Sequence, residues 1–172
     1  TASVFGEMIV FHRLLESETD PKVRLALLTG KIEDAFATAF RQIVMTRFEQ
    51  KLHAARRDEG ELETERIGEL WIEANAPMHG DTVTLTDNYS HWWRYIPHFI
   101  HTPFYTYAYS FGELLVLALY RLYEEKGAAF VPDYMEMLSK GGSVSPSELV
   151  APLGVDINDP GFWHGGLSLL DE

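Results

Sequence analysis

Residues 19–60 read TDPKVRLALLTGKIEDAFATAFRQIVMTRFEQKLHAARRDEG and predict the longest helix of the chain. Asp20-Pro21 is a typical helix start, because a capping side chain is followed by proline at the first helical position. Apolar residues then recur at helical spacing, with the small residues Ala35 and Ala39 beside them. The apolar stripe consists of Ile32, Phe36, Phe40, Ile43, Phe48 and Leu52. We expect the helix to end near Asp58-Glu59-Gly60, where glycine favours termination.

The segments on either side of this helix also follow helical periodicity. Val4, Met8, Phe11 and Leu15 share one face of a predicted first helix. The other predicted helices are Thr64 to Asn75 (stopped by Pro77), Phe104 to Gly127, Phe130 to Leu138, one capped at Ser145-Pro146 and one starting at Asp159-Pro160. Strand-like alternation is confined to Thr82–Thr86. The sequence therefore predicts an all-α fold, with residues 1–172 forming a single helical unit.

Composition limits the classes of function. The 172 residues are 46% hydrophobic and 23% charged, which is typical of a water-soluble domain or a large piece of one. A net charge of −12 disfavours binding to nucleic acid or to an anionic membrane. No apolar stretch reaches the ~20 residues that span a bilayer, and the first residues do not resemble a signal peptide. The absence of cysteine fits a reducing compartment, so we expect the cytoplasm.

The segment His91 to Tyr109, HWWRYIPHFIHTPFYTYAY, is unusually rich in aromatic residues and histidines. At a helix start, Tyr105 and Tyr109 would share a face and Tyr107 would point away. Two phenols beside His98 could donate hydrogen bonds to a developing oxyanion. The alternative is an aromatic core whose polar tips are satisfied by the backbone.

The spacing of His98 and His101 gives little support for a metal site. Helical zinc pairs normally stand four residues apart and need a third ligand, and Pro97 and Pro103 disfavour a regular helix across the pair. The sequence also lacks HExxH, GxSxG, Walker and GxGxxG motifs. Spacing alone therefore supports a helical domain with an aromatic-histidine pocket.

Four stretches, in order along the chain, carry a family resemblance. They are TASVFGE (1–7), FRQIVMTRFEQKLH (40–53), RYIPHFIHTPFYTYAYSFGELL (94–115) and LSKGGSVSPSELVAPLGVDINDPGFW (138–163). Together they resemble the oligoendopeptidase F branch of the M3 zinc metallopeptidases, over essentially the whole chain. Members of that family are large helical proteins that bind zinc through two histidines of an HExxH motif and a later glutamate. The resemblance implies the C-terminal helical part of a zincin-like peptidase catalytic domain.

The resemblance also implies roles for individual residues. His98 matches the histidine of a substrate-contacting loop, and Tyr109 matches a tyrosine that stabilises the tetrahedral intermediate. Tyr105 is the preferred second tyrosine, with Tyr107 as the open alternative. Glu7 matches a carboxylate that supports a zinc-binding histidine. The family's zinc-binding glutamate directly precedes the stretch like TASVFGE, so we expect all three zinc ligands upstream of Thr1 and none in this chain.

We therefore expect part of a zinc-dependent metalloendopeptidase that hydrolyses short peptides. Zinc would belong to the intact enzyme, and this chain, without its N-terminal partner segment, would be inactive and bind no cofactor. Apolar surface left uncovered is expected to drive formation of a homo-oligomer. The alternative is a non-catalytic helical module, derived from the same fold, that binds a peptide or assembles with a partner.

Overall fold

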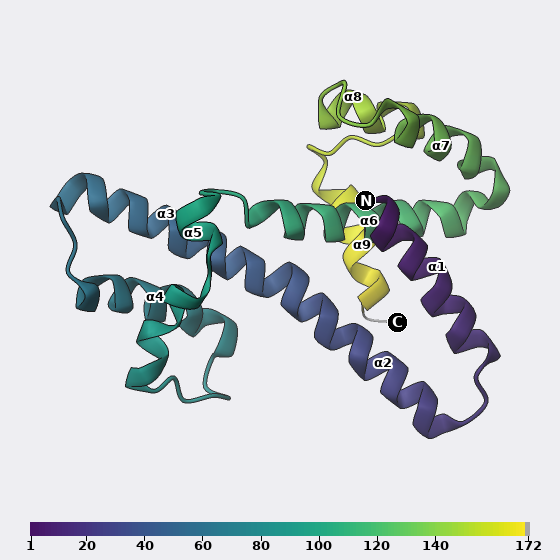
Figure 1. Cartoon of the computed structure of the whole chain (residues 1–172). Helices are drawn as coiled ribbons and strands as arrows, with labels where there is room; N and C mark the ends of the chain where they lie inside the picture. Colours follow the sequence, from purple (N-terminus) through teal and green to yellow (C-terminus); the bar gives the residue numbers. More distant parts are fainter. Residues whose placement is uncertain (171–172) are drawn as a thin grey trace. The chain divides into compact units, whose positions relative to one another are not determined.

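A computed structural model describes residues 1–170 and confirms the all-α prediction. No strand occurs among these residues, and Thr82–Thr86 has no strand structure (Figure 1). The elements are α1 (Ala2–Ser17), α2 (Pro21–Ala35), the π-helix η1 (Phe36–Phe40), α3 (Arg41–Glu59), α4 (Thr64–His79), the 3-10 helix η2 (Asp87–Tyr95), α5 (His98–His101), α6 (Tyr107–Lys126), η3 (Gly127–Phe130), α7 (Val131–Lys140), α8 (Pro146–Val150), η4 (Ala151–Leu153), α9 (Pro160–Leu167) and η5 (Ser168–Leu170).

The chain is organised as two compact units. The first contains Thr1–Ile32 and the chain from Gly112 onward, and the second contains Glu33–Phe111. Helices α2 and α6 each contribute residues to both units. The sequence analysis predicted one helical unit because helical periodicity continues through both places where the chain passes from one unit to the other, near residues 32 and 112.

The core of the second unit lies between α3 and α4, with Ile96 added after η2. The ring of Phe48 is fully buried and makes edge-on contacts with Trp71 and Phe99, at centroid distances of 5.0 Å in both cases. The buried cluster consists of Val44, Met45, Phe48, Ala55, Leu70, Trp71, Ala74 and Ile96. Of the second half of the predicted apolar stripe, Phe48 belongs to this cluster and Leu52 packs against it, whereas Ile43 is half-buried and lies outside the cluster.

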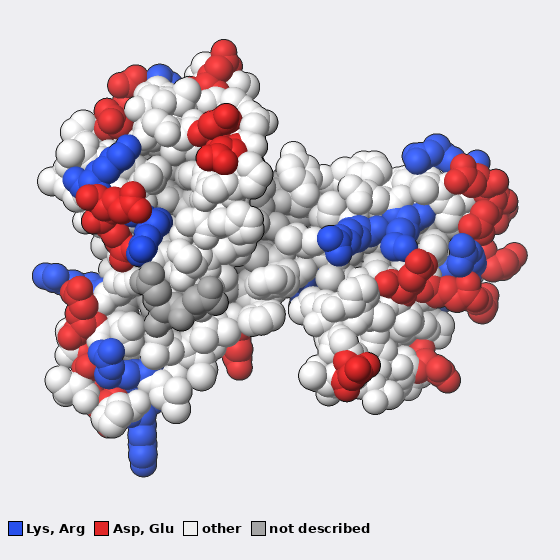
Figure 2. All heavy atoms as spheres, turned by 180° about the vertical axis from the view of Figure 1, so that it is seen from behind, with Lys and Arg blue, Asp and Glu red and all other residues white. Residues whose placement is uncertain are grey.

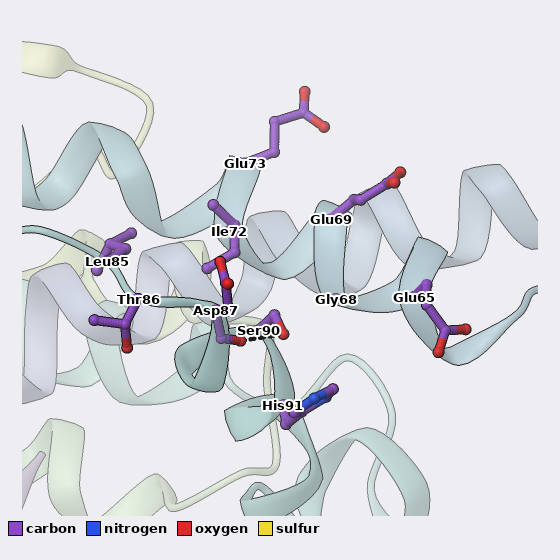
Figure 3. A pocket seen from close by; sticks show the side chains of 10 residues that line it. All are labelled: Glu65, Gly68, Glu69, Ile72, Glu73, Leu85, Thr86, Asp87, Ser90 and His91. Carbon is purple, nitrogen blue, oxygen red and sulfur yellow. Dashed lines mark hydrogen bonds between the residues drawn. The ribbon is translucent and has the colours of Figure 1, made fainter.

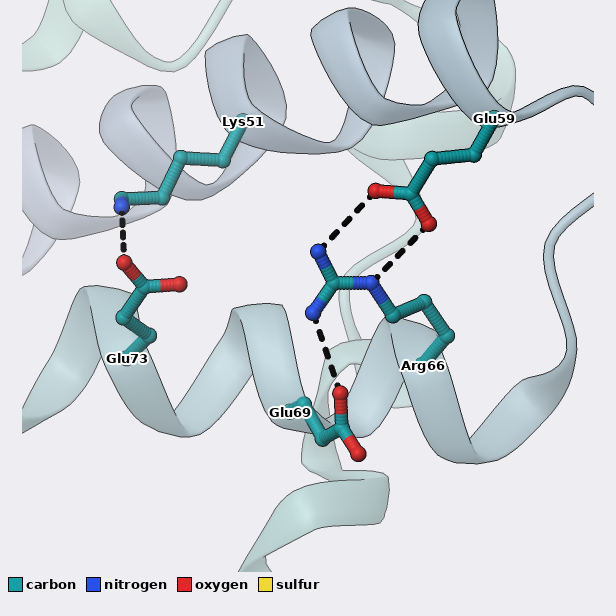
Figure 4. A network of polar contacts seen from close by, with 5 residues as sticks. All are labelled: Lys51, Glu59, Arg66, Glu69 and Glu73. Carbon is teal, nitrogen blue, oxygen red and sulfur yellow. Dashed lines mark hydrogen bonds and ion pairs between the residues drawn. The ribbon is translucent and has the colours of Figure 1, made fainter.

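Ion pairs join the exposed sides of α3 and α4 (Figure 4). Lys51 Nζ lies 2.6 Å from Glu73 Oε1, and the guanidinium of Arg66 donates to both oxygens of Glu59 at 3.1 and 3.0 Å. Arg66 also donates to Glu69 at 3.0 Å. The hydrogen bond from Arg66 lowers the pKa of Glu59, and that from Lys51 lowers the pKa of Glu73. Exposed pairs of this kind contribute little stability, so the apolar contacts dominate.

The core of the first unit is aromatic and centres on α1, α6 and α7. The ring of Phe5 stacks on Tyr134 at 4.4 Å and lies 5.8 Å from Tyr120. In α6, Val116 and Leu119 are fully buried. The helix cap predicted at Ser145 is present and forms a capping box, because Ser145 and Glu148 exchange side-chain and backbone hydrogen bonds.

The hydroxyl of Tyr134 leads to a prediction for this core. Tyr134 is 7% exposed, and its hydroxyl has no hydrogen-bond partner among residues 1–170. Because a buried unpaired hydroxyl is unfavourable, Tyr134→Phe is expected to raise the free energy of unfolding at pH 7 by about 1 kcal/mol. Urea unfolding followed by circular dichroism measures this difference. Lower stability in the variant would show that the hydroxyl is paired in solution.

The advantage of Tyr134→Phe is expected to grow at alkaline pH. Burial raises the pKa of Tyr134 to about 12, above the value of an exposed phenol. The phenol has a pKa of about 10 in the unfolded state, and below that pH it is neutral in both states. As pH rises from there through the pKa of the folded state, ionisation favours the unfolded state, so the parent protein loses stability. Phenylalanine does not ionise, so the variant does not lose this stability. Unfolding measured at pH 8 and pH 11 should therefore separate the two proteins more at pH 11.

Two kinds of detail in the helix predictions were wrong. The helix boundaries differ, because α4 continues past Pro77 to His79 and α6 begins at Tyr107 and not at Phe104. Phe36 and Phe40 are 51% and 40% exposed, whereas the small residues Ala35 and Ala39 are buried. The π-helix η1 causes this second difference, since its wider turn shifts the helical phase within the predicted stripe.

The surface carries both charge and apolar side chains. Figure 2 shows lysine and arginine side chains lying close to acidic ones on the face in view. Apolar side chains more than 40% exposed occur on both α1 and α2. They are Ile9, Val10, Leu14, Val23, Leu25 and Ile32. Self-association through such residues stays a prediction. None of the helices in residues 1–170 has the length and apolar character needed to cross a membrane.

Candidate functional site

Three residues of the aromatic-histidine segment meet in the second unit. The Nε2 atom of His98 lies 3.1 Å from the hydroxyl of Tyr109, within hydrogen-bond distance. The ring of Tyr105 is parallel to that of His98 at 6.1 Å and perpendicular to that of Tyr109 at 5.4 Å. We call these residues the His98–Tyr105–Tyr109 cluster. Tyr105 and Tyr109 are 45% and 39% exposed, so the cluster is not a closed aromatic core.

The backbone explains how residues eleven apart in sequence meet. His98 begins the short helix α5, Tyr109 lies in the first turn of α6, and residues 102–106 turn the chain between them. Thr106 is fully buried, and its hydroxyl lies 3.0 Å from that of Thr46 on α3. Ser110 on α6 donates to the carbonyl of Ala39 at 2.8 Å. Buried hydroxyl contacts thus fix both the turn and the start of α6.

Phe104, at the centre of this turn, has an unusual conformation. Its φ is +59°, the left-handed region that residues other than glycine rarely adopt. Its backbone N–H donates to Oε1 of Glu49 at 2.6 Å, and its ring lies tilted against that of His53, with 4.5 Å between the centroids. Glu49 and His53 both lie on α3. The sequence analysis did not identify Glu49 or His53 as contacts of this turn. Helical periodicity does not show which polar side chains of a helix contact a loop that is far away in the sequence.

Two other candidates of the second unit, Tyr107 and His101, are not part of this cluster. Tyr107 is 57% exposed and makes no ring contact with the cluster within residues 1–170. His101 ends α5 and is exposed. Glu7 belongs to the first unit, where it is exposed and accepts a 2.8 Å hydrogen bond from Lys31. The structure therefore brings together three of the predicted site residues.

Two open cavities also lie in the second unit. One, of about 570 Å³, lies between α4 and η2 and is lined by several carboxylates (Figure 3). Of these, Glu69 and Glu73 are engaged by Arg66 and Lys51. The other, of about 790 Å³, is lined by Arg41, Asn88, His91, Trp92, Arg94 and Tyr95. No group of three or more histidine or carboxylate side chains in residues 1–170 is arranged to hold a metal ion. The residues described thus do not fit a zinc site.

Comparison with known proteins gives this geometry a context. The model of peptidase family M3 matches residues 1–169. The chain is 29% identical over 99% of its length to oligoendopeptidase F (plasmid) of Lactococcus lactis subsp. cremoris, and covers 28% of that protein. It is 31% identical to an oligoendopeptidase F homolog of Borreliella burgdorferi, covering 91% of the chain and 26% of that protein.

A solved structure agrees with these sequence matches. The crystal structure of oligoendopeptidase-F from Enterococcus faecium superposes with a TM-score of 0.88 at 28% identity, over 99% of this chain and 32% of that one. The chain thus spans about a quarter to a third of the length of these relatives. Since both the sequence match and the fold extend over nearly all of the chain, it belongs to peptidase family M3.

Proposed function

We propose that this chain supplies the substrate-contacting side of the active site of a zinc-dependent oligoendopeptidase that hydrolyses short peptides. The hydrogen bond between His98 and Tyr109, with Tyr105 packed against both rings, is the observation that supports this proposal. All three side chains are partly exposed and carry groups that can donate hydrogen bonds. The helical fold alone would not support this proposed role, because proteins with the same fold can have different functions and the side chains of the site decide between them.

Tyr109 is the proposed donor to the tetrahedral intermediate. When His98 donates through Nε2 to the phenolic oxygen, the O–H of Tyr109 is free to donate to a developing oxyanion. The neighbouring imidazole also orients the phenol, so little reorganisation is needed during the reaction. Tyr105, parallel to His98, restricts the imidazole and presents its own phenol to the peptide. These are roles in binding and electrostatic stabilisation.

We place the metal and the attacking water outside residues 1–170, because no group of ligands there fits zinc. Zinc bound elsewhere in the complete enzyme would polarise the carbonyl and activate water. Glu7 is proposed to support a zinc-binding histidine there, in place of its present contact with Lys31. The remaining part of the protein is thus the proposed partner. The absence of cysteine supports a reducing compartment such as the cytoplasm.

A chimera tests the role of Tyr109. This chain would replace the matching region of the Lactococcus lactis oligoendopeptidase F, and cleavage of an internally quenched peptide would be measured with zinc. Tyr109→Phe removes the proposed donor and is expected to lower kcat by about 100-fold with little change in KM, since the bond forms mainly in the transition state. An unchanged kcat would remove Tyr109 from the mechanism.

Two further variants make the comparison specific. Tyr95→Phe alters a more exposed tyrosine (78%) of the same unit and is expected to leave kcat unchanged. Tyr107→Phe tests the alternative second tyrosine: a lower kcat in this variant would show that Tyr107 contributes in place of Tyr105. The isolated chain with zinc should show no turnover, and metal-dependent cleavage by it would contradict the proposal. Peptide binding without turnover in the chimera would instead favour a non-catalytic binding module.

A further inference from the structure

We propose that Glu49 is a positioning residue, which sets the geometry of the His98–Tyr105–Tyr109 cluster through the backbone of Phe104. The effect of Glu49 on catalysis rests on the proposed function. The effect of Glu49 on the conformation of the turn between α5 and α6 does not depend on that function. Glu49 itself lies on α3 and touches none of the three side chains of the cluster in the contacts described above.

The burial of Glu49 is the first observation. Its side chain is 1% exposed, and Phe48, the residue before it on α3, belongs to the buried cluster of this unit. No ion pair accompanies it within residues 1–170, and its Oε2 atom has no hydrogen-bond partner there. A buried carboxylate without a cation is costly, and an apolar side chain would serve the core better. The single hydrogen bond through Oε1 is therefore the contact that distinguishes glutamate at this position.

The partner of that hydrogen bond is the second observation. The N–H of Phe104 donates to Oε1 of Glu49 at 2.6 Å. Phe104 also has the strained φ of +59°, which persists only where surrounding contacts hold it. Because Phe104 lies in the turn that joins α5 to α6, the Glu49 carboxylate holds a backbone conformation that would otherwise relax.

The third observation is what this bend connects. Tyr105 directly follows Phe104, and His98 and Tyr109 lie on the two helices that the turn joins. Their contacts, 3.1 Å between His98 and Tyr109 and parallel rings for His98 and Tyr105, depend on how the turn places α5 relative to α6. Relaxation at Phe104 would displace these groups from one another. A misplacement of about 1 Å can lower a catalytic rate by about 100-fold.

The structural part is tested on the chain itself by nuclear magnetic resonance. Glu49→Met removes the acceptor at nearly constant volume, Glu49→Gln keeps an amide oxygen at the same place, and Gln50→Met is a control at the exposed neighbour. In Glu49→Met we expect the chemical shift of the Phe104 amide proton to move upfield. We also expect that adding Tyr109→Phe no longer changes the chemical shift of the His98 ring nitrogen, as it does in the parent chain. Glu49→Gln should retain most of both signals, and Gln50→Met all of them. An unchanged Phe104 amide in a folded Glu49→Met protein would overturn the proposal.

The catalytic part is tested in the chimera, with rates divided by the folded fraction from circular dichroism. Glu49→Met is expected to lower kcat by about 100-fold while KM changes only a few-fold, because misplaced groups fail mainly in the transition state. Glu49→Gln should restore kcat to within about tenfold of the parent. An equal loss of kcat in Glu49→Gln and Glu49→Met would contradict a role through the acceptor oxygen. If Glu49→Met does not fold, Glu49→Gln still tests the proposal through its expected kcat. A parent chimera without activity would contradict the proposed function, while the resonance measurements still decide the role of Glu49 in the turn.

Discussion

Replacing Phe48 by alanine is expected to lower the free energy of unfolding by about 4 kcal/mol, the middle of the range for buried phenylalanines. The side chain is completely buried and touches Trp71 and Phe99 edge-on, both at 5.0 Å. The change therefore removes apolar contacts from α3, α4 and α5 at once and leaves a cavity that helices cannot close without moving. Urea unfolding of the whole chain, followed by circular dichroism, measures the loss.

Phe40→Ala is the matched control for Phe48→Ala. Phe40 precedes the same helix but is 40% exposed, and its main ring contact is with the exposed Phe36 at 4.9 Å. Its replacement is expected to cost about 1 kcal/mol or less, since partly exposed side chains lose little burial. If the two variants were equally destabilised, the second unit would not be organised around Phe48.

Gly166→Ala is expected to destabilise the first unit by about 3 kcal/mol, the upper end of the cost of overpacking. Gly166 lies on α9, where a Cβ atom would come 2.6 Å from the backbone nitrogen of Ala118 on α6 and 2.8 Å from its Cα. Backbone atoms cannot rotate away as a flexible side chain does, so α9 would have to move off α6. Thermal and urea unfolding of the variant measure the effect.

The neighbouring glycine provides the control for Gly166→Ala. A Cβ atom on Gly165, in the same helix, would meet nothing within 4 Å. Gly165→Ala is expected to raise stability by up to about 1 kcal/mol, because alanine favours helix more than glycine does. Destabilisation of equal size at both positions would argue that the loss comes from the helix and not from close packing on Ala118.

Much of the fold could be predicted because helix signals are local. Pro21, the Ser145-Pro146 pair and Asp159-Pro160 each mark a helix start that the structure contains. The division into two units could not be predicted, since it depends on contacts between segments far apart in sequence. The exposed faces of Phe36 and Phe40 were also missed, because a hydrophobicity pattern assumes one constant period.

The candidate site was partly predictable for a related reason. His98, Tyr105 and Tyr109 lie within twelve residues of each other, and residue type together with the family resemblance associated them, whereas spacing alone left an aromatic core open. Glu49 lies 55 residues from Phe104, and in sequence it reads as one more charged residue on a long helix. Only the burial of its side chain and the direction of its hydrogen bond distinguish it.

The π-helix Phe36–Phe40 also affects how this chain should be aligned with its relatives. A π turn amounts to one residue added within an otherwise regular helix, here between α2 and α3. Deleting one residue there would convert the segment to ordinary α-helix, keep the helix unbroken and leave the flanking turns in the same rotational register. Relatives one residue shorter in this segment could thus have the same core residues on α3, and a single-residue gap within 36–40 would be the structurally correct alignment.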